Sequence, residues 1–94
     1  MGNSTDFREH MGSDYKVYVE VSEIRQKDGK VIPMSFVWED GMPYEIDKII
    51  DIRRAASLKA GGAGLRYTVR VQNRETFMFL EEDLGVGKWF MERR

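Results

Sequence analysis

Apolar and polar residues alternate along most of this chain, and this alternation restricts what it can fold into. The segment 17–22 (VYVEVS) places three valines on one side, and the segment 66–72 (RYTVRVQ) does the same with Tyr67, Val69 and Val71. Successive side chains of a strand point to opposite faces, so each segment would bury one face and expose the other. We therefore predict half-buried β-strands for these segments.

Glycine-containing turns separate the alternating segments. Asp28-Gly29 and Asp40-Gly41 are dipeptides that tolerate the backbone conformations of tight turns. Between them, the segment 31–39 is predicted to be a strand with its large apolar side chains on one face: Ile32, Met34, Phe36 and Trp38. Pro33 has no N–H to donate, which suits an edge strand or the start of a strand. The position of Trp38 at the end of this stripe predicts that it lies in the core.

The segment 42–53 (MPYEIDKIIDIR) has two interpretations. As a strand, it has four apolar side chains on one face: Tyr44, Ile46, Ile50 and Ile52. Ile49 breaks this alternation, which predicts a bulge or bend near Lys48. As a helix, Ile46, Ile49, Ile50 and Arg53 would follow the i, i+3 and i+4 spacing. The branched aliphatic side chains and the preceding turn favour the strand.

The number of expected strands determines the fold class. Further strands are expected at 66–72, 75–81 and 88–92, which gives five or six short strands joined mostly by tight turns. An antiparallel sheet of this size removes its free edges best by curling. We therefore predict an all-β protein, a small antiparallel barrel.

The chain is expected to form one domain. Ninety-four residues leave little room for a second domain. Residues 1–14 are polar, and we expect a flexible leader before a single barrel domain at 15–94. The start-like Met11-Gly12-Ser13 is typical of a junction with an expression tag, so we expect no functional role for the leader.

Several short motifs follow one another in a recognisable order. An aromatic-ended strand, Phe36-Val37-Trp38, precedes a glycine turn and then a strand in which Tyr44 comes before branched aliphatic residues. A terminal aromatic strand with Trp89-Phe90 completes the pattern over roughly residues 15–92. In this order the chain resembles a family of small uncharacterised bacterial proteins. The resemblance implies an SH3-like barrel, and the family has no assigned activity. Small barrels of this shape bind nucleic acids or peptides, so the fold alone does not choose between these functions.

The sequence lacks the residues that most catalytic and metal sites use. It contains no cysteine, and its only histidine is His10 in the expected leader. This composition argues against thiolate zinc sites, cysteine nucleophiles and Ser-His triads. The acidic run 81–83 lacks the ligand spacing of a calcium loop. We therefore expect no catalysis, no cofactor and no metal. No apolar run is long enough to cross a membrane, which together with the missing cysteines predicts a cytoplasmic location.

Charge is distributed unevenly along the chain. Between Ile52 and Glu75 there are six basic residues and no acidic residue, so this segment carries +6. Because the formal net charge is −1, the rest of the chain carries −7. Arginines bind phosphates, and glycines allow close approach of the backbone to a ligand. We predict a nucleic-acid or phosphate site from the basic residues and glycines of this stretch: Arg53, Arg54, Lys59, Gly61, Gly62, Gly64, Arg66, Arg70 and Arg74.

Alternatives to this site remain open. Acidic residues on neighbouring strands could pair with the arginines and neutralise them: Glu45, Asp47, Asp51 and Glu75. Exposed aromatic side chains such as Tyr18, Tyr44 or Trp38 could instead form a groove for a partner peptide. A third alternative is an accessory subunit that binds a larger protein and has no ligand of its own.

Overall fold

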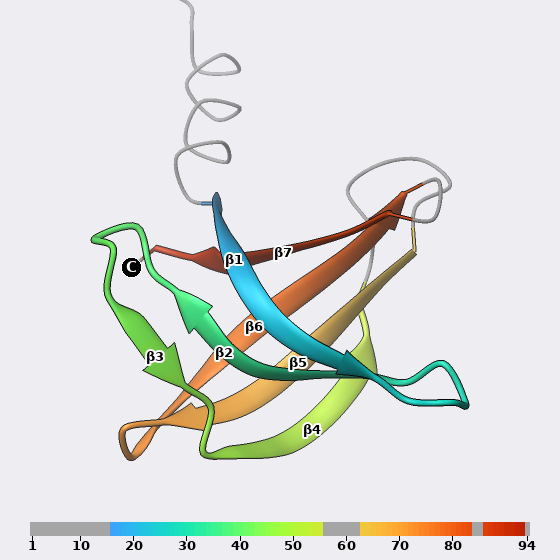
Figure 1. Ribbon diagram of the computed structural model, residues 1–94, viewed down its shortest axis with the longest axis horizontal. Helices are drawn as coiled ribbons and strands as arrows, with labels where there is room; N and C mark the ends of the chain where they lie inside the picture. Colours follow the sequence, from blue (N-terminus) through green and yellow to red (C-terminus); the bar gives the residue numbers. More distant parts are fainter. Residues whose placement is uncertain (1–15, 56–62, 84–85, 94) are drawn as a thin grey trace, which may run out of the picture.

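The molecule is a single antiparallel sheet of seven strands that curls on itself (Figure 1). The computed structural model describes residues 16–55, 63–83 and 86–93, so the expected leader lies outside the described residues. The strands are β1 (Lys16–Arg25), β2 (Val31–Val37), β3 (Pro43–Glu45), β4 (Lys48–Arg54), β5 (Ala63–Val71), β6 (Arg74–Asp83) and β7 (Val86–Glu92). The predicted all-β fold is confirmed, with seven strands in place of five or six.

The connection between β3 and β4 makes the sheet curl. The strand order of the sheet is β3-β2-β1-β7-β6-β5-β4, so β3 and β4, which are consecutive in the chain, form the two opposite edges of the sheet. Only Ile46 and Asp47 separate them. The Ile46 N–H donates to the carbonyl of Met34 on β2, at 3.0 Å, and the Asp47 N–H donates to the carbonyl of Arg70 on β5, at 2.9 Å. The sheet therefore forms a half-barrel whose edges meet at this corner, where β3 leads into β4 (Figure 1).

A bulge in β2 corrects the predicted apolar stripe of that strand. The pairing with β1 skips one residue of β2, Met34, whose side chain is 46% exposed. Before this bulge Pro33 is buried and Ile32 lies on the other face; after it, Phe36 is buried. The prediction that Ile32 and Met34 share a face with Phe36 was wrong, because an extra residue reverses the alternation. Trp38 is half-buried and packs against the core.

A second bulge, in β4, changes which isoleucines face inward. Ile49 pairs with Val69 and Asp51 pairs with Thr68, so Ile50 is the extra residue, and its side chain is 40% exposed. Ile49 packs against the core instead. The predicted break in alternation is confirmed, whereas the inward position predicted for Ile50 was wrong. The expected single strand 42–53 is divided into β3 and β4 at the corner.

The core lies on the concave side of the half-barrel. The predicted inward face of β5 is confirmed, since Tyr67, Val69 and Val71 are all buried. Tyr67 packs against Trp89 of β7, with 5.0 Å between the ring centroids. The Tyr67 hydroxyl also donates to the carbonyl of Val31, at 2.6 Å, and so joins β5 to β2, two strands that are not neighbours in the sheet.

Among the described residues, no helix is long and apolar enough to cross a membrane.

Candidate nucleic-acid interface

The outer face of β4 and β5 brings four basic side chains together. The two strands pair, and their register places Arg53 opposite Arg66 and Lys48 opposite Arg70. Arg66 and Arg70 alternate with the buried Tyr67 and Val69, so all four side chains lie on the convex side. We call these four residues the basic face. Like charges directly opposite on neighbouring strands repel each other. Such a cluster is therefore a surface on which an anion would relieve repulsion.

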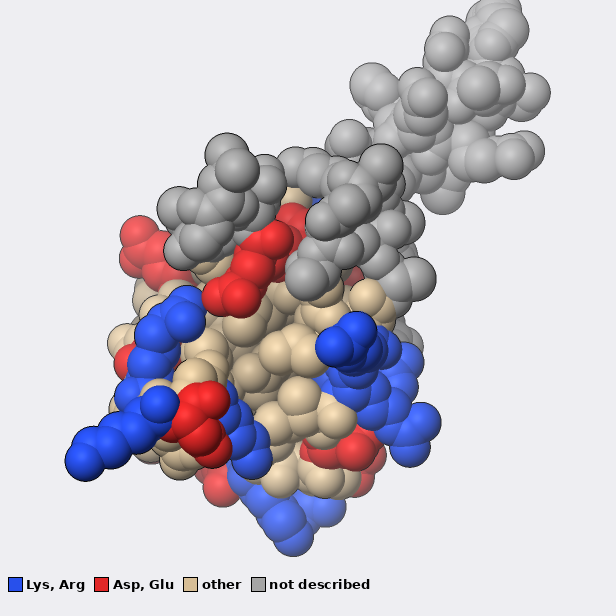
Figure 2. Space-filling model, turned by 90° about the vertical axis from the view of Figure 1, so that its right-hand side faces the viewer, with Lys and Arg blue, Asp and Glu red and all other residues tan. Residues whose placement is uncertain are grey.

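Two acidic side chains partly neutralise the basic face. The Nε of Arg53 lies 2.6 Å from Oδ2 of Asp51, and an Nη of Arg70 lies 3.5 Å from Oε2 of Glu75. Both pairs are exposed, so they contribute little to stability, and each uses one of the nitrogens of its arginine. On the side of the molecule in Figure 2, acidic side chains likewise lie next to basic ones around an uncharged central area.

The other two acids considered from the sequence do not neutralise the basic face. A carboxylate oxygen of Asp47 accepts the backbone N–H of Gln72, at 3.1 Å. Glu45 lies on β3 opposite Ser35, and none of the ion pairs among the described residues includes it. Neutralisation by neighbouring acids is therefore seen for Arg53 and Arg70 among the basic residues of this face.

Arg66 differs from the other basic residues because an aromatic ring holds it in place. Its Cζ lies 4.7 Å from the centroid of the Phe77 ring on β6, within the range of a cation–π contact. Its Nε is buried and has no hydrogen-bond partner among the described residues. A guanidinium that is already held in one orientation loses less freedom when it binds a phosphate. Arg66 is therefore the best-positioned phosphate ligand of the basic face.

A row of aromatic side chains continues from Arg66 across the convex side. The register aligns Arg66 on β5 with Phe79 on β6, Phe90 on β7 and Tyr18 on β1. The rings of Phe79 and Phe90 stack at 4.8 Å, and Tyr18 packs edge-on against Phe90 at 5.8 Å. The Tyr18 side chain is 52% exposed. The prediction from sequence missed this row, although these rings alternate with the core residues Met78 and Trp89 in their strands.

Several predicted site residues do not belong to the basic face. Arg54 pairs with Leu65, and Arg74 pairs with Val71 beside the β5–β6 turn, so the alternation of these strands places both on the opposite side from Arg66. Gly64 is part of β5, where it pairs with Glu81. Lys59, Gly61 and Gly62 lie outside the described residues. Of the predicted set, the structure therefore brings together Arg53, Arg66 and Arg70 and adds Lys48.

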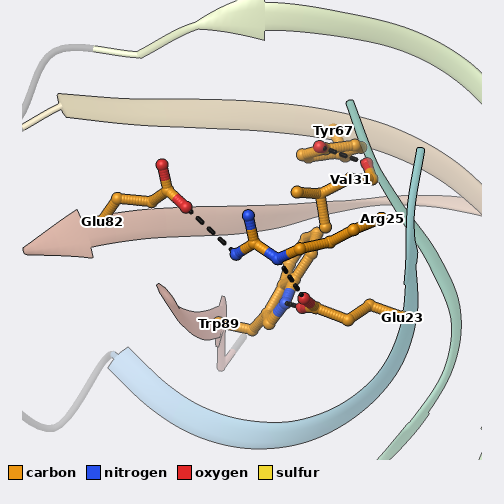
Figure 3. A network of polar contacts seen from close by, with 6 residues as sticks. All are labelled: Glu23, Arg25, Val31, Tyr67, Glu82 and Trp89. Carbon is orange, nitrogen blue, oxygen red and sulfur yellow. Dashed lines mark hydrogen bonds and ion pairs between the residues drawn. The ribbon is translucent and has the colours of Figure 1, made fainter. Parts of the chain in front are cut away.

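A polar network lies on the concave side, and its residues had no predicted role (Figure 3). The indole N–H of Trp89 donates to the carboxylate of Glu23, at 2.7 Å. Arg25 lies 3.3 Å from Glu23 and 3.2 Å from Glu82, so it connects β1 to β6. Burial raises the pKa of the nearby Tyr67 hydroxyl, and the negative charges of Glu23 and Glu82 raise it further.

The described residues do not form a metal-binding cluster of three or more histidine, cysteine or acidic side chains. The fold and the basic face define an all-β half-barrel with a convex cationic surface. No protein-family model matches the chain, and no curated protein or solved structure matches it either. The resemblance to SH3-like bacterial proteins stays a prediction.

Proposed function

We propose that this protein is a non-catalytic binding domain that contacts the phosphates of a nucleic acid through the basic face. The observation that carries the proposal is the register of β4 and β5, which sets Arg53 opposite Arg66 and Lys48 opposite Arg70. Arginine recognises phosphate through its planar set of donors, and lysine adds a compact positive charge. The ion pair of Arg53 uses its Nε and that of Arg70 uses one Nη, so each pair leaves other guanidinium nitrogens for such contacts.

The dimensions of the surface support contact with more than one nucleotide. Arg66 and Arg70 are four residues apart on one strand, a separation of about 13 Å at the usual rise per residue. Tyr18 lies three strands away from Arg66 in the same row, about 14 Å at the usual strand spacing. An exposed ring at this distance from the phosphate contacts can stack on a base, as in proteins that bind single strands.

A salt titration tests the proposal. Fluorescence anisotropy of labelled single- and double-stranded oligonucleotides would be measured for the wild type and for the Arg66→Ala, Arg70→Ala double variant. We expect the double variant to bind all oligonucleotide sequences more weakly, because phosphate contacts carry no sequence information. The slope of log K against log salt should fall by about two, since each contact contributes roughly 0.9 on duplex DNA.

Substitution of the neighbouring acids provides a test in the opposite direction. Asp51→Asn and Glu75→Gln release Arg53 and Arg70 from their ion pairs, so each should strengthen binding by about two- to fivefold, the range of one exposed ion pair. Lys27→Ala, in the β1–β2 turn, is the matched control and should leave binding unchanged. If the wild type binds no oligonucleotide at about 50 mM salt, where phosphate contacts are strong, the proposal is wrong.

A further inference from the structure

The aromatic row on the convex side, formed by Phe79, Phe90 and Tyr18, exposes one of its rings much more than the other two. The rings of Phe79 and Phe90 stack with an angle of 7° between their planes, so each covers a face of the other. Lys16 covers Phe90 further, because its Nζ lies 4.4 Å from the ring centroid, and Phe90 is 7% exposed. Tyr18 is 52% exposed. Tyr18 is therefore the ring of the aromatic row on which a flat ligand can lie.

Tyr18 has a defined orientation, although half of its surface is exposed. Its hydroxyl donates to the carboxylate of Glu81 on β6, at 3.0 Å, so the side chain reaches across β7. Its ring also packs edge-on against Phe90, with 61° between the ring planes. The ammonium group of Lys16 donates to the same carboxylate, at 3.2 Å, and offsets its negative charge. A ring that is already ordered loses little freedom when a ligand stacks on it.

Positive charge and exposed aromatic surface lie at opposite ends of the line from Arg66 to Tyr18. The basic face carries four positive charges, and the nearby Asp51 and Glu75 leave an excess of two. The outward side chains around Tyr18 are two bases and three acids, so the sum of their charges is −1: Lys16, Lys88, Glu20, Glu81 and Glu92. The basic face therefore suits phosphates, whereas Tyr18 suits an uncharged ring. A nucleic acid contains both groups at a distance from each other.

The shape of this surface favours a single strand over a duplex. The basic face and Tyr18 both lie on the convex side of the half-barrel. A duplex is itself a convex cylinder, so the two bodies would touch over a small area, and its bases are stacked inside where Tyr18 cannot reach their faces. A single strand is flexible, and its unstacked bases can turn outward and stack on aromatic side chains. Only a single strand can therefore use both ends of the surface.

We propose that the ligand of this surface is a single-stranded nucleic acid, with one base stacked on Tyr18 and phosphates a few nucleotides away on the basic face. This inference rests on the proposed function and narrows its ligand to single strands. Tyr18 and Arg66 are three strands apart, about 14 Å at the usual spacing, so the nucleic acid crosses the strands β5, β6, β7 and β1. Every base has a flat face, so stacking adds affinity without sequence preference.

Fluorescence anisotropy with the full chain tests this inference. The labelled probes have one length and one mixed sequence: a single strand, as DNA and as RNA, the DNA duplex, and an abasic strand that keeps the sugar-phosphate backbone. They are compared at about 200 mM salt, where phosphate contacts are weakened. We expect both single strands to bind at least about fivefold more tightly than the duplex and the abasic strand, the smaller effect seen for one stacked base.

Variants of Tyr18 separate stacking from phosphate binding. Tyr18→Ala should weaken binding of the single strands by at least about fivefold and leave duplex binding unchanged. Its slope of log K against log salt should equal that of the wild type, because no phosphate contact is lost. Tyr18→Phe keeps the ring and should bind within about twofold of the wild type. Ile24→Ala is the matched control, since Ile24 is also 52% exposed on β1 but lies six residues away, about 20 Å.

The inference is overturned if the duplex or the abasic strand binds as tightly as the single strands. It is also overturned if Tyr18→Ala binds the single strands like the wild type or like Tyr18→Phe. In these cases the Arg66→Ala, Arg70→Ala double variant still weakens binding if the proposed function is right, so the two failures are distinguishable. If no oligonucleotide binds at about 50 mM salt, the proposed function and this inference are both wrong.

Discussion

The substitution Tyr67→Phe tests how the half-barrel is held together on its unpaired side. Tyr67 is 1% exposed, and its hydroxyl donates to the carbonyl of Val31, at 2.6 Å. This bond joins β5 to β2, which are not neighbours in the strand order. The variant removes one oxygen atom and keeps the ring, so its packing against Trp89 is retained. The experiment therefore isolates a single hydrogen bond between strands that have no ladder in common.

The expected loss of stability follows from burial of the acceptor. A typical hydrogen bond contributes about 0.5–1.5 kcal/mol, and a buried polar group left without a partner costs about 1–3 kcal/mol. We therefore expect Tyr67→Phe to lower the free energy of unfolding by about 1–3 kcal/mol. At roughly 4–8 °C per kcal/mol for a domain of this size, Tm should fall by about 4–24 °C.

Tyr67 should also make the stability of the protein sensitive to alkaline pH. Its pKa is raised in the folded state by burial and by Glu23 and Glu82. Above the ordinary tyrosine pKa of about 10, the unfolded chain loses this proton while the folded protein retains it. The unfolded state then binds fewer protons, so the free energy of unfolding falls as pH rises from about 10 through the folded pKa. Tyr67→Phe should reduce this alkaline loss.

Urea unfolding of the wild type and the variant, at neutral pH and above about pH 10, measures both effects. Tyr18→Phe is the matched control. Its hydroxyl donates to Glu81, at 3.0 Å, but the side chain is exposed, so we expect a change of less than about 0.5 kcal/mol. The reasoning is refuted if the two variants are equally stable at neutral pH. An alkaline loss that is the same in Tyr67→Phe and wild type would contradict the linkage argument separately.

Three further outcomes are expected. Trp38→Ala should lower the free energy of unfolding in urea by about 1–3 kcal/mol, because the ring is half-buried and packs against the core. A fully buried aromatic side chain would cost roughly 3–5 kcal/mol. A loss below about 0.5 kcal/mol, as at an ordinary surface site, would show that this packing is unimportant. Gly29→Ala should cost about 1 kcal/mol or more, since Gly29 has a φ of 92° in the β1–β2 turn, and an equally stable variant would contradict this strain. In an NMR pH titration, the Glu39 carboxylate should show a pKa below the ordinary 4.5, because Arg93 donates hydrogen bonds to it. Arg93→Ala should raise this pKa, and an unchanged pKa would show that Arg93 is not the cause.

The sequence predicted the general fold and one face of the candidate site, because both depend on local patterns. Alternation around Tyr67 and Val69 set the inward face of β5, and with it the outward direction of Arg66 and Arg70. The break at Ile49 predicted a bulge or bend near Lys48, and the bulge lies in β4 between Ile49 and Asp51. These inferences need only the period of two that every strand imposes on its own side chains.

The bulge in β2, the opposed cations and the aromatic row were decided by tertiary structure. A bulge is defined by the partner strand, so the local pattern around Met34 did not show that this residue is extra relative to β1. The same holds for Lys48, whose position opposite Arg70 depends on the register of two strands. The aromatic row brings Tyr18 to Phe79 and Phe90, which are distant from it in the sequence, so it depends on the pairing of β1, β6 and β7. Strand register is fixed by contacts between distant segments, whereas alternation is fixed within each one.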